Sequence, residues 1–216
     1  MDKLRNLIVF FIKNFPRGLK RTELVKLVYL FEYGHVQNCG CQYSGVEFIR
    51  YRYGPFAQEI INEADGLIAN DILRCTWHPS FKYGKMAFIY SLNDIASIDD
   101  YCLPEWEKHY ALSIIDRTKS MSCEEIIKTV YSTPPMVHII NYEKQLGHED
   151  YQRRINMTEG KKSPKRFTKE ELEVAKKQLD ASPDRGTKED YYQSLLETYN
   201  DYEDFKRRAN ICLLQN

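Results

Sequence analysis

The sequence predicts an α+β domain that is mainly α-helical with a small antiparallel β-sheet in winged-helix-like order, followed by a helical C-terminal extension. Apolar residues recur at spacings of three and four along several segments, which is typical of helices that bury one face. Shorter aromatic and β-branched runs lie between these segments and are bounded by glycine and proline, as expected of strands. A charged connector over residues 156–167 separates the domain, residues 1–155, from the extension, residues 168–216.

Composition narrows the class of protein. With 216 residues and 43% hydrophobic content, the chain can bury a full core. Its formal net charge is +0 at pH 7, so no global field attracts nucleic acid or an anionic membrane. The six cysteines lack the density of a secreted disulfide scaffold, and we therefore expect a cytoplasmic protein.

The first expected helix spans residues 2–14 and ends before the turn Pro16-Arg17-Gly18. Its apolar run over residues 7–12 is interrupted by Lys13, and no small-residue cleavage site follows. A membrane span needs about 20 apolar residues, so we expect a buried helix and no membrane segment. The residues expected on its buried side are Leu4, Leu7, Ile8, Phe11 and Phe15.

The second expected helix begins near residues 20–22, where Thr22 could cap it, and stops around Gly34. Lys26 and Glu32 lie off its apolar stripe. The stripe itself predicts a core contact and consists of Leu24, Leu27, Val28 and Phe31.

A polar loop over residues 37–45 leads to a strand expected over residues 46–53. Gly54-Pro55 should stop this strand, because proline fixes φ and lacks the N–H that a ladder would use. A third helix is expected over residues 56–69, with apolar positions Ile60, Ile61, Ala64 and Ile68. Strand residues alternate between faces, so Tyr51 and Tyr53 should share one side and Arg50 and Arg52 the other.

A hairpin follows, with strands over residues 72–76 and 86–92 joined by a loop that holds Pro79 and Gly84. Pro104 can open a further helix at its first turn. A capping box at Ser122 predicts a short helix over residues 122–131, which Thr133-Pro134-Pro135 ends, and helix resumes over residues 138–146. The residues expected on the buried side of the helix after Pro104 are Trp106, Tyr110, Ile114 and Ile115.

The extension predicts two helices. Residues 168–171 cap a helix of about a dozen residues, which residues 182–186 end. Residues 187–214 then read as one long helix, whose apolar seam includes Tyr199 and Tyr202 and is interrupted by Lys206. This helix is either an arm folded back on the core or an arm that binds a partner or joins two copies of the chain.

Residues 21–60 resemble a known family. The run Lys26-Leu27-Val28-Tyr29-Leu30, a glycine-containing turn, and then Tyr53-Gly54-Pro55-Phe56 before a helix resemble the Panacea domain, the SocA-like antitoxin domain of bacterial and phage toxin–antitoxin systems. The similarity extends over about residues 4–142 and marks a structural motif of Lys26, Leu27, Tyr29, Gly54 and Pro55.

The resemblance implies a non-enzymatic protein that binds and neutralises a cognate protein toxin by direct contact, a role used in phage defence. The tyrosine-rich tail departs from the family pattern and leaves open where the partner docks. Tyrosine and arginine are enriched in interface hot spots, which suggests two candidate surfaces, one at the corner before Pro55 and one in the tail. The predicted partner-binding residues are Arg50, Tyr51, Arg52, Tyr53, Tyr199 and Tyr202.

Two other functions stay open. The order helix, helix, strand, helix, hairpin is close to a winged-helix DNA-binding regulator, and an adaptor that delivers a bound protein to a protease is also compatible with the sequence. Nucleic acid is disfavoured because the helix over residues 56–69 carries no Lys or Arg, and its acidic side chains would be repelled by phosphate. Those side chains are Glu59, Glu63 and Asp65, whereas a small wing-like cluster consists of Trp77, Lys82, Tyr83 and Lys85.

No catalytic residues and no cofactor are predicted, since the chain lacks a phosphate loop, a nucleophile elbow and a His-Glu-x-x-His helix. His109, His138 and His148 stand without a recognisable catalytic partner. We predict no metal site either. The alternative is a zinc site, for which Cys-x-Cys spacing is tighter than usual, with the ligands Cys39, Cys41, Cys75 and His78.

Overall fold

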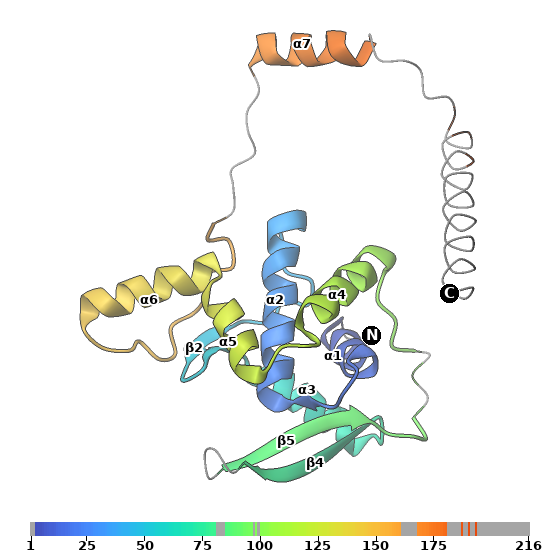
Figure 1. Ribbon diagram of the computed structural model, residues 1–216, viewed down its shortest axis with the longest axis vertical. Helices are drawn as coiled ribbons and strands as arrows, with labels where there is room; N and C mark the ends of the chain where they lie inside the picture. Colours follow the sequence, from blue (N-terminus) through green and yellow to red (C-terminus); the bar gives the residue numbers. More distant parts are fainter. Residues whose placement is uncertain are drawn as a thin grey trace, which may run out of the picture. The chain divides into compact units, whose positions relative to one another are not determined.

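A computed structural model describes residues 3–80, 85–96, 98, 100–160, 168–180, 187, 190 and 193. The chain divides into two units, residues 1–162 and residues 163–216. The described part of the first unit contains helices and two small antiparallel sheets, which confirms the predicted mainly helical α+β class (Figure 1). None of the helices in the described part of the chain is both long and apolar enough to cross a membrane.

Helix α2 (Arg21–Cys39) lies at the centre of the first unit, between α1 (Lys3–Asn14), α4 (Glu105–Thr118) and α5 (Cys123–Tyr131) (Figure 1). The predicted stripe of α2 is buried, and so is the expected side of α1. Because neighbours surround α2, its charged positions are buried as well. These are Glu23, Lys26 and Glu32.

The buried carboxylates of α2 have partners that fix its two ends. Glu23 pairs with Arg17 at 2.8 Å and accepts the backbone N–H of Lys20 at 3.0 Å. Lys20 is therefore the N-cap, and the prediction that Thr22 caps this helix is wrong. Glu32 accepts the backbone N–H groups of Tyr43 and Ser44 at 2.7 and 2.9 Å, which anchors the loop after α2.

The larger sheet has the strand order β1 (Leu19–Lys20), β5 (Lys85–Leu92), β4 (Leu73–Ser80), all antiparallel. The expected β4–β5 hairpin is confirmed, but β4 is longer than predicted and includes Pro79, which pairs with Met86. Leu73 and Tyr90 at the base of the hairpin are buried in the core. Residues 81–84, which include Lys82, Tyr83 and Gly84, lie outside the described part of the chain.

The smaller sheet corrects the prediction for residues 46–69. Instead of one strand stopped by Gly54-Pro55, the chain forms a tight hairpin of β2 (Ile49–Tyr51) and β3 (Gly54–Phe56). The chain reverses at Arg52 and Tyr53, and Gly54 has φ 89°, a left-handed conformation that glycine accepts readily, at the start of β3, where Pro55 pairs with Arg50. Helix α3 (Gln58–Ala69) starts two residues later than expected, and Leu67 rather than Ile68 is buried in it.

Three further helices, α4, α5 and α6, complete the described part of the first unit. Pro104 is the N-cap of α4, whose buried residues are Ala111, Ile114, Ile115 and Thr118. Trp106, in the first turn of α4, is 43% exposed, contrary to the prediction, although its ring stacks on that of Tyr110 with the ring centres 5.2 Å apart. The capping box of Ser122 and Glu125 is confirmed at the start of α5.

Helix α6 (Pro134–Leu146) starts four residues before the predicted His138, since proline is well tolerated in a first helical turn. In the second unit, the predicted helix of about a dozen residues is present as α7 (Lys169–Asp180). The long helix expected over residues 187–214, with Tyr199 and Tyr202, falls on residues that the structure leaves almost entirely undescribed.

Candidate functional site

The β2–β3 hairpin is fixed to α6 by a buried ion pair. The guanidinium of Arg50 donates to both carboxylate oxygens of Glu143, at 3.0 Å from Nε and 3.3 Å from Nη2. Only 3% of Arg50 is exposed, and its guanidinium lies 5.6 Å from the ring centre of Tyr131 and 5.4 Å from that of Tyr151. A planar bidentate pair between two rings holds Arg50 in one orientation.

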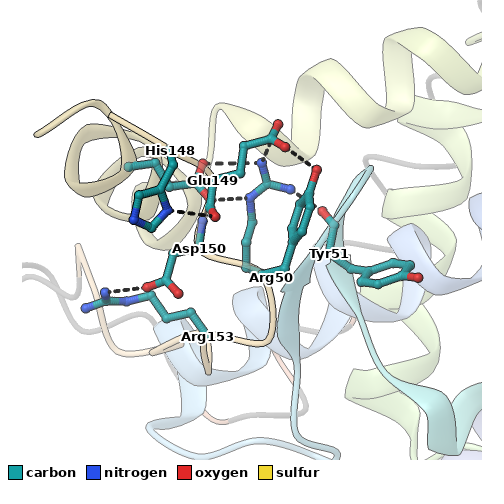
Figure 2. A network of polar contacts seen from close by, with 8 residues as sticks. Arg50, Tyr51, His148, Glu149, Asp150 and Arg153 are labelled. Carbon is teal, nitrogen blue, oxygen red and sulfur yellow. Dashed lines mark hydrogen bonds and ion pairs between the residues drawn. The ribbon is translucent and has the colours of Figure 1, made fainter. Parts of the chain in front are cut away.

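The segment after α6 runs beside β2 and fixes its backbone. The N–H of Arg50 donates to the Arg153 carbonyl at 2.7 Å, and the N–H of Gln152 donates to the Arg50 carbonyl at 2.9 Å. Figure 2 shows Arg50 pointing toward the loop that carries Glu149 and Asp150, and Asp150 in turn pairs with Arg153 at 3.0 Å. Residues near 150 therefore hold the backbone of Arg50, and a carboxylate oxygen of Glu149 also lies 3.9 Å from its guanidinium.

Helix α2 holds the hairpin from its other side. Nζ of Lys26 donates to the Pro55 carbonyl at 2.5 Å. The pKa of Lys26 is lowered to about 7, mainly because burial desolvates its charged form; Cys123 opposes this shift and the nearby positive charge of Arg50 adds to it. One turn along α2, the hydroxyl of Tyr29 lies 2.8 Å from Oγ1 of Thr133, just before α6. Lys26, Tyr29 and Pro55 of the predicted structural motif all take part in these contacts, and Leu27 is fully buried. We call the buried polar contacts of Lys26 with Pro55 and of Arg50 with Glu143 the buried frame.

Three neighbouring side chains of the hairpin face outward. Tyr51 is 37% exposed, Tyr53 is 53% exposed, and Arg52 between them is exposed too. Tyr151 lies against them, with its ring centre 6.1 Å from that of Tyr51. We call the four residues Tyr51, Arg52, Tyr53 and Tyr151 the corner surface. It combines large rigid rings with one guanidinium, the residue types that dominate protein interfaces.

Two expectations about this corner need correction. Arg50 was expected at an accessible surface corner, but it is buried in the ion pair with Glu143. Arg50 and Arg52 were expected on one side of a strand, but the strand ends at Tyr51, so the alternation of faces ends there and Arg52 is exposed.

Sequence reasoning missed Glu143 and Tyr151. Glu143 is 93 residues from Arg50 in the chain, and no local pattern marks either residue as its neighbour. His148 is exposed, and its Nδ1 lies 3.2 Å from the Glu149 carbonyl, a backbone group. His109 and His138 are also exposed.

The four residues considered for zinc do not come together. Within the described residues, no three or more His, Cys, Asp or Glu side chains are grouped as a metal ion would require. Cys39 and Cys41 lie at the end of α2, whereas Cys75 and His78 lie in β4. The structure therefore does not assemble the tetrahedral site considered as an alternative from Cys39, Cys41, Cys75 and His78.

Comparisons with known proteins place this frame in a family. The family described as "Antitoxin SocA-like, Panacea domain" matches residues 24–135, a range that holds Lys26, Tyr29, Gly54 and Pro55 but ends before Glu143 and Tyr151. Neither the curated proteins nor the solved structures gave a match. Since the family match covers more than half of the 216 residues, the chain belongs to the SocA-like antitoxin family with the Panacea domain.

Proposed function

We propose that this protein is an antitoxin that binds a cognate protein toxin directly in the cytoplasm and neutralises it through the corner surface. The observation that carries this proposal is the exposure of Tyr51, Arg52, Tyr53 and Tyr151 on a hairpin held from beneath by buried polar contacts. Tyrosine offers a large contact area with few rotatable bonds, and arginine adds a planar set of donors.

The buried frame supports binding because it orders the hairpin before a partner arrives. The Arg50–Glu143 pair and the contact of Lys26 with Pro55 fix the hairpin from two sides. A partner then loses less affinity to the ordering of loops and side chains. Binding at such a surface neutralises the toxin either by covering its active surface or by holding it in an inactive state.

The test is co-expression with the product of the neighbouring gene, scored by growth, together with titration of a catalytically inactive form of that product. Arg52→Ala and Tyr53→Ala should each weaken binding by about 1–3 kcal/mol and reduce growth rescue, because they truncate exposed hot-spot side chains. Arg117→Ala, which removes an exposed guanidinium on α4, is the matched control and should bind like the parent.

The outcomes separate the function from the surface. If the neighbouring product neither binds nor is neutralised, the proposal of toxin neutralisation is wrong. If it binds and both corner variants bind as tightly as Arg117→Ala, neutralisation stands and the corner surface is wrong.

A further inference from the structure

The outer half of the β4–β5 hairpin carries apolar side chains that the core leaves uncovered. Trp77 and Phe88 are directly paired across the strands, and Met86 lies two residues from Phe88 on the same face. Trp77 is 65% exposed, and Met86 and Phe88 are also exposed. We call Trp77, Met86 and Phe88 the hairpin face. Contiguous exposed apolar side chains of this size mark interaction sites.

A guanidinium lies at the inner edge of this face. Arg21, the first residue of α2, lies with its guanidinium 4.3 Å from the ring centre of Phe88, and its Nε donates to the Tyr90 hydroxyl at 3.0 Å. Among the described residues, no carboxylate lies within ion-pair distance of Arg21. The terminal nitrogens of Arg21 therefore have donors to offer to a carboxylate from outside.

The hairpin contributes no carboxylate to this face, since the sequence contains no Asp or Glu from residue 72 to residue 93. Arg74 lies on the opposite face of β4 and pairs with Asp94 at 3.4 Å, so Arg21 is the cation that the described contacts place on the hairpin face. A ligand that covers the face would thus meet apolar side chains and the guanidinium of Arg21. The complementary surface is apolar and acidic.

We propose that the hairpin face is a docking surface for an acidic amphipathic segment of another protein. Its apolar side chains cover Trp77, Met86 and Phe88, and one of its carboxylates pairs with Arg21. The surface is separate from the corner surface, which belongs to the other sheet. The proposal therefore adds a second contact to the function proposed above.

Nucleic acid fits this face less well. Binding along a phosphate backbone uses several cations, and Arg21 is the one cation that the described contacts place on the face. Met86 offers no ring for base stacking.

Trp77 provides the readout. The chain has two tryptophans, so full-length protein carrying Trp106→Phe reports on Trp77 alone. This protein is titrated with three probes: a short amphipathic peptide of leucine and glutamate, the same peptide with lysine in place of glutamate, and single-stranded oligothymidine. We expect the glutamate peptide to give a saturable blue shift of Trp77 emission and to bind about tenfold more tightly than the lysine peptide.

Variants then test the two parts of the face. Arg21→Gln should weaken binding of the glutamate peptide about tenfold, whereas Arg117→Gln and Arg52→Ala should bind it like the parent. Trp77→Ser, followed by the anisotropy of labelled peptide, should also bind weakly. If Arg21→Gln lowers the melting temperature, Arg21→Lys is measured as well. This variant keeps the positive charge, so it should retain most of the affinity for the glutamate peptide if the charge of Arg21 binds that peptide.

Four results would overturn the proposal. These are no saturable change in Trp77 emission, equal binding of both peptides, tighter binding of oligothymidine, and association between copies of this chain that Trp77→Ser abolishes. None of them bears on toxin binding at the corner surface, which Arg52→Ala and Tyr53→Ala test separately.

Discussion

Gly54 is the residue at which the hairpin depends most on backbone conformation. Its φ of 89° is strained for any residue with a side chain, and a Cβ there would lie 3.2 Å from the ring of Tyr131. Gly54→Val should therefore destabilise the protein by about 1–3 kcal/mol in chemical denaturation. Gly66→Ala in α3 is the control. The nearest atom to a Cβ added at Gly66 is 3.9 Å away, so this substitution should leave the stability of the protein unchanged or raise it slightly. Equal stability of the two variants would contradict this account.

Lys26 makes stability depend on pH. Its pKa falls from the ordinary 10.5 to about 7 on folding because the charged form is desolvated. Between these two values the unfolded chain binds a proton that the folded protein does not hold. This group's contribution to the free energy of unfolding therefore rises with pH, by at most about 1.4 kcal/mol per pH unit.

The matching measurement is urea denaturation between about pH 7 and pH 9, a window set by the lowered pKa of Lys26. Lys26→Met should remove the increase with pH, since methionine keeps the length of the side chain and does not titrate. Lys13→Met replaces an exposed lysine at the end of α1 and should leave the slope unchanged. A parental slope in Lys26→Met would show that another group causes it.

At the scale of elements, the hairpin and α6 are joined by the Arg50–Glu143 pair, whose members are 3% and 7% exposed. Removing Arg50 leaves the buried Glu143 carboxylate without its cation, and removing Glu143 leaves the buried guanidinium with Glu149 at 3.9 Å as its remaining carboxylate. Arg50→Met and Glu143→Leu should each destabilise the protein by about 3–5 kcal/mol. The double variant should lose much less stability than the sum of the two single losses, because it buries no unpaired charge. Additive losses in denaturation would mean that the pair does not couple the two elements.

For the whole molecule, the division into residues 1–162 and 163–216 predicts that the first unit folds by itself. A chain ending at Lys162 should unfold cooperatively with a melting temperature close to that of the full chain, measured by circular dichroism. It should also keep toxin binding, because the corner surface lies in this unit. If binding is lost while the shortened chain stays folded and monodisperse, the tail with Tyr199 and Tyr202 carries the interface instead.

The sequence by itself determined the elements whose signals are local. The spacing of Leu4, Leu7, Ile8 and Phe11 predicted a buried first helix, and Ser122 with Glu125 predicted the start of α5. Such patterns repeat within one or two helical turns, so neighbouring residues suffice to predict them. The family resemblance was also visible in short motifs around Lys26 and Gly54.

Only the tertiary structure decided which polar groups are buried and what they bind. The local pattern placed Lys26 off the core stripe and could not choose between Arg50 and Tyr51 for burial. In the structure, Lys26 binds Pro55 across 29 residues and Arg50 binds Glu143 across 93. A buried charge needs a partner with matching geometry, and that partner comes from wherever the fold brings it. Tyr151 is likewise about 100 residues from Tyr51 in the sequence, and only the folded structure places it in the corner surface.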